Sequence, residues 1–403
     1  MAQKGKNYNT ILVKGTPDYP LLVITLILLL FGLIMLLSAS TPSSLAETGD
    51  SYSIFKKQAA FAIVGVVIAS GVSFFNYRII ESKFIQKALY GMCFVLTVSV
   101  LAMGASSGGA TRWITIPGLF TFQPSELIKL CIILFYAGYL PTLKDKVKNA
   151  NGFIRKYGVG FVWPIILIGT LLVSILIVQN HLSVCILIFF IVGAQMLVSG
   201  MITSRFLVAT IVILLILGIV VGGIFGLYSL IKSNDVVTEE EESGFNFRNE
   251  RIKVWLDPDS NLTGTGWQIN QSFYAIGSGG LFGVGLGNSN QKNLYIPEPH
   301  NDFIFAVVAE ELGFVGCMFI IILFIMFIWR GLIIAMKATD MQGTLLAIGT
   351  TTLIGMEAII NMAVVTGTIP VTGMALPFFS YGGTALIVNL IAVGLLISVS
   401  RKK

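Results

Sequence analysis

The sequence predicts an all-α polytopic membrane protein, with about ten transmembrane helices in a single domain that covers residues 1–403. Of the 403 residues, 55% are hydrophobic and only 11% are charged, against roughly 25% charged residues in an ordinary soluble domain. The hydrophobic residues form long runs, and a helix needs about 20 apolar residues to cross a bilayer. The composition excludes a water-soluble globule, and the formal charge of +6 gives little support for nucleic-acid binding.

Ten apolar runs predict the membrane spans. A basic N-terminal segment, residues 1–19, precedes the first run, and no small-residue cleavage site is obvious after that run, so we expect it to stay as an anchor. The fourth and tenth runs are shorter than a full crossing, and the tenth could begin earlier, near Leu376. The predicted spans are 20–39, 58–75, 88–104, 124–140, 160–178, 182–199, 205–228, 303–329, 343–365 and 384–399.

The basic residues predict the orientation. If the N-terminus is cytoplasmic, the inside segments hold most of the 26 Lys and Arg residues, including Lys144, Lys146 and Lys148 after the fourth span. The positive-inside rule then places both termini in the cytoplasm. The largest loop, residues 229–302 between the seventh and eighth spans, lies outside, together with the loop that holds Arg112 and Trp113.

The large loop has two parts. Four consecutive glutamates, 239–242, are most simply a solvated stretch. From Phe247 onward the composition changes to aromatic, amide and glycine residues, and we expect this part to fold. Its glycines superficially resemble a nucleotide-binding loop, but no strand precedes them and no Walker lysine follows. Sharp turns and close packing against the bilayer surface explain them better: Gly277, Gly279, Gly280, Gly283, Gly285 and Gly287.

Cysteine and histidine usage excludes a zinc enzyme. The only two histidines, His181 and His300, cannot form a His/Cys constellation with zinc spacing. The cysteines lie apart in apolar stretches and are expected to be small core residues: Cys93, Cys131, Cys185 and Cys317.

Three acidic residues at the start of the eighth span are candidates for chemistry. Ionisable groups at or inside a span are costly and are therefore functional candidates. On one continuous helix, Asp302 and Glu310 would lie within about 80° of each other and could face one cavity. For Asp302, helix capping and a general base with a raised pKa both remain open. For Glu310 and Glu311, the alternative is an interhelical polar contact.

Further candidates surround the fourth span. Glu126 and Lys129 are three residues apart and share a helix face, as either a buried ion pair or the charged wall of a polar cavity. Trp113 is most simply an interfacial anchor. Arg112, like Arg251 in the large loop, would suit a phosphate, although an interfacial arginine needs no such role.

The segment TGTIPVTGMALPFFSYGGTA, residues 366–385, is rich in Pro, Gly, Thr, Ser and Tyr where a simple hydrophilic loop would be charged. We expect a re-entrant or folded segment that lines something polar. Three loops thus predict a polar, outward-facing cavity, and from these residues alone a transporter and a lipid-handling enzyme are comparable.

At these positions the chain resembles the SEDS (shape, elongation, division and sporulation) family of peptidoglycan glycosyltransferases, the family of FtsW, RodA and SpoVE. The resemblance runs over nearly the whole length and rests on motifs in the family's order: GATRWI, FQPSELIKL, RIKVWLDP, YIPEPHNDFIFAVVAEELGFVG and VTGTIPVTGMALPFFSYGG. GATRWI and the entry Pro17-Asp18-Tyr19 look more like the division (FtsW) and sporulation (SpoVE) branches than the rod-shape branch.

The resemblance implies a lipid II polymerase that makes β-1,4 glycan strands, with Asp302 as the general base that deprotonates the acceptor hydroxyl. It also favours a functional over a purely structural interpretation of Trp113, Glu126 and Lys129, because they match family positions associated with activity. A single in-line inversion with one base would suffice, without the two carboxylates of a retaining enzyme. Basic residues or a divalent cation must balance the leaving pyrophosphate; we expect Arg251, Lys292, and Mg²⁺ or Mn²⁺ held largely by substrate phosphates, with no organic cofactor.

The resemblance also implies partners and a location: a class B penicillin-binding protein transpeptidase, other division or sporulation proteins, and the bacterial cytoplasmic membrane. Two departures stand out. QNHLSV replaces the family's Q-P-D-L-G-T, which puts Asn180, His181 and Ser183 in place of Pro, Asp and Gly, and Asn301 replaces the threonine before Asp302. The alternatives are a lipid II flippase, which would more naturally carry an internal repeat, and a non-catalytic scaffold for the transpeptidase.

Overall fold

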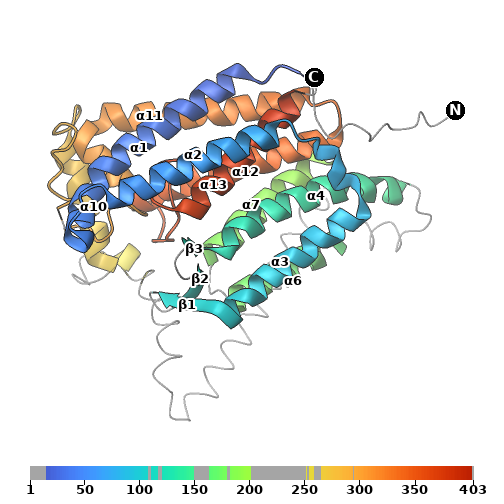
Figure 1. The fold of residues 1–403 in the computed structure, drawn as a ribbon, viewed down its shortest axis with the longest axis horizontal. Coiled ribbons are helices and arrows are strands. Elements are labelled where there is room, and N and C mark those ends of the chain that lie inside the picture. Colours follow the sequence, from blue (N-terminus) through green and yellow to red (C-terminus); the bar gives the residue numbers. More distant parts are fainter. Residues whose placement is uncertain are drawn as a thin grey trace, which may run out of the picture.

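In the computed structural model, the chain is a bundle of long helices with a small sheet at one end (Figure 1). The structure describes residues 15–107, 110–116, 120–148, 163–178, 182–200, 251, 254–257, 265–293 and 295–401. The predicted span 205–228, the glutamates 239–242, and Asn180 and His181 lie outside the described residues.

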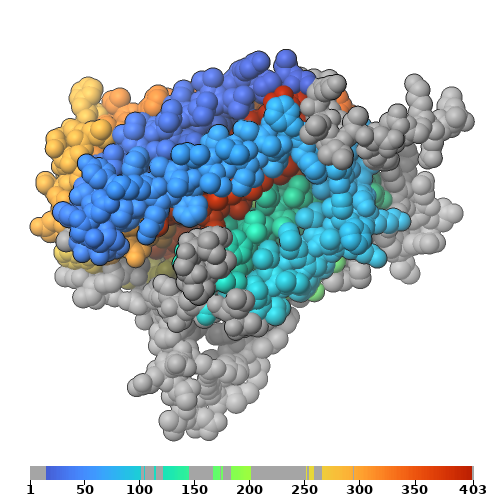
Figure 2. All heavy atoms as spheres, in the orientation of Figure 1, coloured from blue at the N-terminus to red at the C-terminus, as the bar shows by residue number. Residues whose placement is uncertain are grey.

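Two groups of helices form the bundle, and α12 packs against members of both. The first group holds α1 (Tyr19–Thr48), α2 (Ser53–Ser73), α11 (Ile304–Lys337), α12 (Met341–Val365) and α13 (Gly383–Ser400). The second holds α3 (Lys83–Met103), α4 (Pro124–Lys148), α6 (Trp163–Val178) and α7 (Leu182–Val198), with a short 3-10 helix, η1 (Tyr77–Glu81), before α3. Figure 2 shows α13, in red, between the blue α1–α2 pair and the cyan-green α3 and α4.

The bundle is that of a multi-pass membrane protein. Among the described residues, seven helices are long and apolar enough to cross a membrane, and α7 is apolar but shorter. Large apolar side chains such as Ile63, Val67 and Trp329 are about two-thirds exposed, as expected for surfaces that face lipid. Nine of the predicted spans coincide with described helices. The expectation of a short fourth span is wrong, because α4 continues past the apolar run to Lys148.

A three-stranded antiparallel sheet, which the sequence analysis did not predict, precedes α4. It consists of β1 (Gly104–Ser107), β2 (Ala110–Ile116) and β3 (Phe120–Phe122), in the order β1-β2-β3. β2 is rich in the β-branched residues that favour strands, but the three strands are too short to give a clear periodic signal. The sheet holds the predicted loop with Arg112 and Trp113 in a defined conformation.

The two ends of the bundle differ. The start of α1 and the end of α13 lie at one end, while the α1–α2 turn, α10 (Thr265–Gly279) and the sheet lie toward the other (Figure 1). An ion pair and a hydrogen bond stabilise this first end: Arg330 pairs with Asp18 at 2.6 Å, and the Arg401 guanidinium donates to the Gly15 carbonyl at 2.8 Å. The predicted polar loops therefore share the end opposite the termini.

Helix α11 is interrupted at Gly313, whose backbone is left-handed (φ 65°, ψ −165°). The glycine-rich turn 280–285 fills the gap: the amide of Val284 donates to the Glu310 carbonyl at 3.0 Å, and that of Phe314 donates to the Gly280 carbonyl at 2.9 Å. A Cβ on Gly283 would lie 2.1 Å from the Glu311 carbonyl oxygen. The prediction of sharp turns is confirmed at Gly280, Gly283, Gly285 and Gly287, whose φ angles are positive, whereas Gly277 lies inside α10 with open space around its Cβ position. The turn satisfies backbone groups at the break in α11.

Candidate active site

Asp302 lies in a turn at the loop end of the bundle, directly before α11. The helix begins at Ile304 and its N-cap residue is Phe303, so Asp302 does not occupy the capping position. Its side chain is half-buried, and its Oδ2 atom lies 3.4 Å from where a Cβ on Gly373 would be. The carboxylate thus faces the segment that joins α12 to α13.

That segment, residues 366–382, folds back onto the turn that carries Asp302. The amide of Tyr381 donates to the His300 carbonyl at 2.8 Å, and the Ser380 hydroxyl donates to the Asn301 carbonyl at 2.7 Å. α13 begins only at Gly383, so the tenth span does not start near Leu376. The expectation of a folded, non-helical segment is confirmed, and its polar backbone lines the region around Asp302.

Arg251 joins the site from the large loop. Its guanidinium donates to the Val371 carbonyl at 3.1 Å. Burial lowers the pKa of Arg251, and the negative charge of Asp302 opposes that shift; the guanidinium stays charged, since arginine keeps its proton in proteins. The neighbouring Trp255 indole donates to the Gly367 carbonyl at 2.8 Å. The structure therefore brings together the predicted base and one of the two residues predicted to balance the pyrophosphate.

Asn361 of α12 reaches the same place from inside the bundle. Its amide nitrogen donates to the carbonyls of Asp302, at 2.8 Å, and Met374, at 2.7 Å. The sequence analysis missed this residue, although a polar amide inside an apolar span indicates a buried hydrogen-bonding site.

Glu126 and Lys129 form an ion pair at 2.8 Å. Of the two interpretations, a buried ion pair or the charged wall of a polar cavity, the structure shows the ion pair. A third charge completes the cluster: Glu357 of α12 also contacts the Lys129 ammonium, and it accepts a hydrogen bond from Asn389 of α13 at 3.1 Å. The three charged side chains are each less than 10% exposed. The sequence analysis missed Glu357, although it is an acidic residue inside an apolar span.

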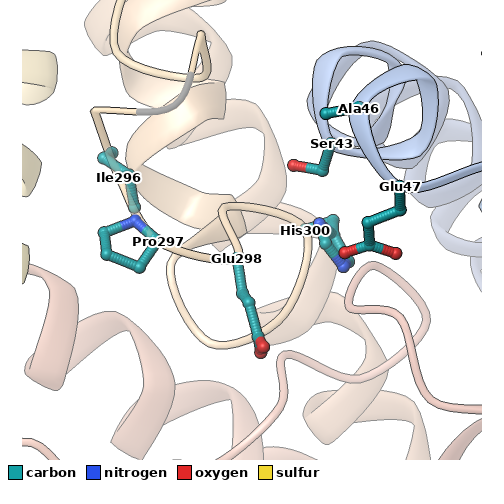
Figure 3. A pocket seen from close by; sticks show the side chains of 7 residues that line it. All are labelled: Ser43, Ala46, Glu47, Ile296, Pro297, Glu298 and His300. Carbon is teal, nitrogen blue, oxygen red and sulfur yellow. The ribbon is translucent and has the colours of Figure 1, made fainter.

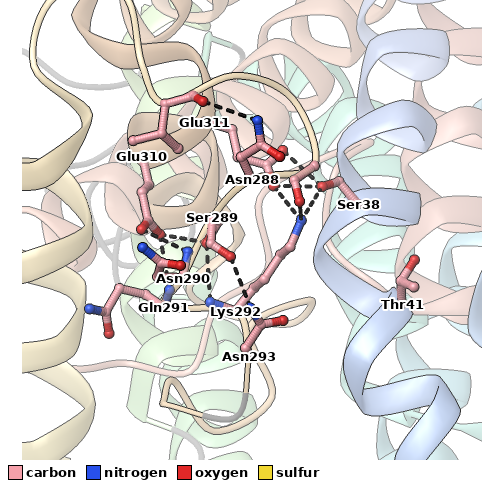
Figure 4. Close-up of polar contacts among 12 residues, drawn as sticks. Ser38, Thr41, Asn288, Ser289, Asn290, Gln291, Lys292, Asn293, Glu310 and Glu311 are labelled. Atoms are coloured by element: carbon pink, nitrogen blue, oxygen red, sulfur yellow. Dashed lines mark hydrogen bonds and ion pairs between the residues drawn. The ribbon is translucent and has the colours of Figure 1, made fainter.

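Lys292 is held in a second cluster (Figure 4). Its ammonium contacts Glu311 at 2.7 Å, the Ser38 hydroxyl at 3.0 Å and the Gly287 carbonyl at 2.6 Å. An ammonium has three donors, so all are used, and Lys292 is 5% exposed. This geometry favours a structural role for Lys292 over the predicted contact with pyrophosphate.

The Glu310 carboxylate binds the large loop after its glycine-rich turn. It accepts hydrogen bonds from the Ser289 hydroxyl and from the backbone amide of Asn290, the latter at 2.9 Å, and so holds the turn after the glycine-rich segment (Figure 4). The expectation that Asp302 and Glu310 share a helix face is wrong, because Asp302 precedes the helix and the rotation of 100° per residue does not apply to it. Glu311 makes the interhelical polar contact that was the alternative interpretation, because it accepts a hydrogen bond from Ser38 of α1 at 2.6 Å. Among the described residues, the hydrogen bonds of the Glu310 carboxylate are with the large loop and not with another helix.

A pocket of about 170 Å³ opens beside the Asp302 turn, between the end of α1 and residues 296–300 (Figure 3). Glu47, Glu298 and His300 line it. Burial lowers the pKa of His300, against the opposing effect of the two glutamates. Among the described residues, no group of three His, Cys, Asp or Glu side chains has the geometry to hold a metal ion.

The remaining predicted residues lie near the sheet and α7. Trp113 is half-buried in β2, where it pairs with Ala105 of β1. The backbone of Arg112 belongs to β2, and its side chain lies outside the described atoms. The Ser183 hydroxyl donates to the Thr372 carbonyl at 2.8 Å. The start of α7, which holds this altered residue of QNHLSV, therefore abuts the segment that lines the site.

These features define a multi-pass helical membrane protein whose polar site lies at the loop end of the bundle, around one half-buried aspartate. The chain belongs to the FtsW/RodA/SpoVE family of cell cycle proteins, whose model matches residues 19–403. Curated relatives match over nearly their full lengths. Stage V sporulation protein E of Bacillus subtilis is 38% identical, over 96% of this chain and 98% of that protein. A probable peptidoglycan glycosyltransferase FtsW of Trichlorobacter lovleyi is 35% identical, over 95% and 93%.

Solved structures share the fold. One chain, from work described as "Structural coordination of polymerization and crosslinking by a peptidoglycan synthase complex", aligns with a TM-score of 0.69 at 24% identity over 96% of this chain and 98% of that one. The rod shape determining protein RodA of Thermus thermophilus aligns with a TM-score of 0.63 at 24% identity, over 96% and 97%. The predicted family resemblance is confirmed.

Proposed function

We propose that this protein is a peptidoglycan glycosyltransferase that polymerises lipid II into β-1,4 glycan strands in cell division or sporulation. Relatives of this chain at about 35% identity are named as probable peptidoglycan glycosyltransferases. The observation that carries the proposal is the half-buried Asp302 carboxylate, which lies outside the N-cap position, beside Arg251 and against the backbone of Gly373.

Asp302 acts as the general base. It removes the proton from the acceptor sugar hydroxyl while that oxygen attacks the anomeric carbon of the donor, whose bond to the pyrophosphate breaks. One carboxylate is enough for this inversion, because no covalent sugar intermediate needs a second. A positioned base of this kind contributes about 10²–10⁴-fold in rate.

Arg251 offsets the negative charge that develops on the leaving pyrophosphate, since its charge interacts with that of Asp302. A divalent cation, Mg²⁺ or Mn²⁺, would supply further charge when bound. With no three-ligand cluster among the described residues, such an ion would be held by one carboxylate, with Asp302 as the candidate, and by substrate phosphates, as Mg²⁺ often is.

The working surroundings follow from the same proposal. Both termini face the cytoplasm of a bacterial cell, and the site opens at the outer face of the cytoplasmic membrane, where the positive-inside rule puts the polar loops. The partner is a class B penicillin-binding protein transpeptidase with other division or sporulation proteins. A solved neighbour belongs to a complex that couples polymerization and crosslinking.

Neither the flippase nor the scaffold alternative requires Asp302 to act as a general base. The test is to purify the chain in detergent, with and without a candidate transpeptidase, and to supply labelled lipid II with Mg²⁺, Mn²⁺ or EDTA. We expect a ladder of glycan chains. In micelles a flippase or a scaffold makes no polymer, so lipid II that stays unpolymerised under every condition would refute the proposal, and translocation across vesicles would then identify a flippase.

A further inference from the structure

A buried side chain of α12 binds the backbone of Asp302 itself. Asn361 is 1% exposed, and its amide nitrogen donates to two carbonyls, those of Asp302 and Met374, at 2.8 and 2.7 Å. Its Oδ1 atom has no hydrogen-bond partner among the described residues. The polar function of Asn361 is therefore to donate, and both of its donors serve this junction.

The two carbonyls belong to the two segments that face each other across the candidate site. One is the turn that carries Asp302, and the other is the segment whose Gly373 backbone lies against the Asp302 carboxylate. Tyr381 and Ser380 join the same two segments at His300 and Asn301. The Asn361 amide joins them at Asp302 itself, where the carboxylate faces the Gly373 backbone.

The charged cluster of Glu126, Lys129 and Glu357 supports this arrangement. Glu357 lies four residues before Asn361, on the same face of α12. Its contact with Lys129 ties that face to α4, and its hydrogen bond to Asn389 ties it to α13. The height and rotation of Asn361 are thereby fixed by groups one helical turn away.

We propose that Asn361 is a positioning residue for Asp302, and that it holds the carboxylate at the distance from its facing wall that the reaction needs. The inference rests on the proposed polymerase function. A displacement of about 1 Å at a reacting group can cost about 10²-fold in rate, which is the scale of the effect expected when the amide is removed.

The test compares Asn361→Leu with Gln195→Leu in the purified full-length chain. Leucine keeps the size of asparagine and removes both donors. Gln195 of α7 is a matched control: it is fully buried, its amide nitrogen also bridges two carbonyls, those of Ile133 and Leu345 at 3.1 Å each, and its Oε1 atom is likewise without a partner among the described residues. It lies away from Asp302.

We expect the two variants to have similar unfolding midpoints, since each loses the same kind of hydrogen bonds. Only Asn361→Leu should lower kcat for glycan synthesis, by about 10²-fold, with the KM for lipid II within a few-fold of native. Equal activity in the two variants, or native kcat in Asn361→Leu, would overturn the inference alone. If the native chain and Gln195→Leu both make no polymer, the proposed function fails and takes this inference with it.

Discussion

At the scale of single residues, two buried clusters pair opposite charges inside the bundle, and these contacts distinguish structural charges from the proposed catalytic one. Lys292 and Glu311 neutralise each other, and Glu126 and Glu357 share Lys129. Asp302 differs because it is half-buried at the loop end, beside a cationic Arg251. A carboxylate in this position can meet a substrate.

Lys292→Met should lower the free energy of unfolding by about 3–5 kcal/mol, because it leaves the fully buried Glu311 without its partner. The double variant Lys292→Met with Glu311→Leu should recover most of that loss. Thermal unfolding in detergent measures both. If Lys292 instead contacts pyrophosphate, the double variant would be stable but would still lose polymerisation.

His300 predicts a pH dependence of stability. Its pKa is lowered by burial from the ordinary 6.5, so the unfolded chain takes up a proton at higher pH than the folded chain. Between these two pKa values the unfolded state binds more protons, and stability therefore falls as pH drops below about 6.5. We expect unfolding midpoints from pH 8 to pH 5 to fall less in His300→Gln. An equal slope in both chains would contradict this account.

At the scale of elements, the interruption of α11 makes the glycine-rich turn part of the helix bundle. Gly283 has φ 78° and lies against the Glu311 carbonyl, so a side chain meets both backbone strain and a fixed carbonyl.

Gly283→Ala should cost more than about 2 kcal/mol of stability and should lower activity. Gly277→Ala is the control, because Gly277 sits inside α10 with open space around its Cβ position. It should be neutral or more stable by about 0.5–1 kcal/mol. Chemical or thermal unfolding measures the stability of both variants. Equal losses in Gly283→Ala and Gly277→Ala would show that the turn does not pack as described.

The helices could be predicted from the sequence because long apolar runs leave the chain few other structures in a bilayer. The sheet could not, since its three strands are short and their pairing is a tertiary property. Among the site residues, the contact between Glu126 and Lys129 could be predicted, because residues three apart share a helix face. The partnership of Lys129 with Glu357 was not, because it joins α4 to α12 across 228 residues of sequence.

At the scale of the whole molecule, the start of α1 and the end of α13 lie at one end of the bundle, while the sheet and α10 lie toward the other (Figure 1). Asp302 directly precedes α11, which packs against α10. The proposed use of a lipid-linked substrate on one face of the membrane requires that the two ends of the bundle differ in this way.

The proposed orientation predicts a labelling pattern in intact cells. A cysteine at Tyr52, which is 53% exposed in the α1–α2 turn, should react with a membrane-impermeant maleimide. A cysteine at the exposed Lys337, at the other end of α11, should react only after permeabilisation. The native chain is the control for the four natural cysteines, of which three are buried. The reverse pattern would contradict the placement of the site outside.

The central claim is that Asp302 is the base of a lipid II polymerase. The most direct measurement is the rate of glycan formation by Asp302→Asn beside the native chain, under whichever metal and partner condition supports native activity, with equal unfolding midpoints as the check on folding. Asparagine keeps the size of the side chain and removes the base. The account predicts a loss of at least about 10²-fold. A folded Asp302→Asn variant that polymerises lipid II at the native rate would contradict it.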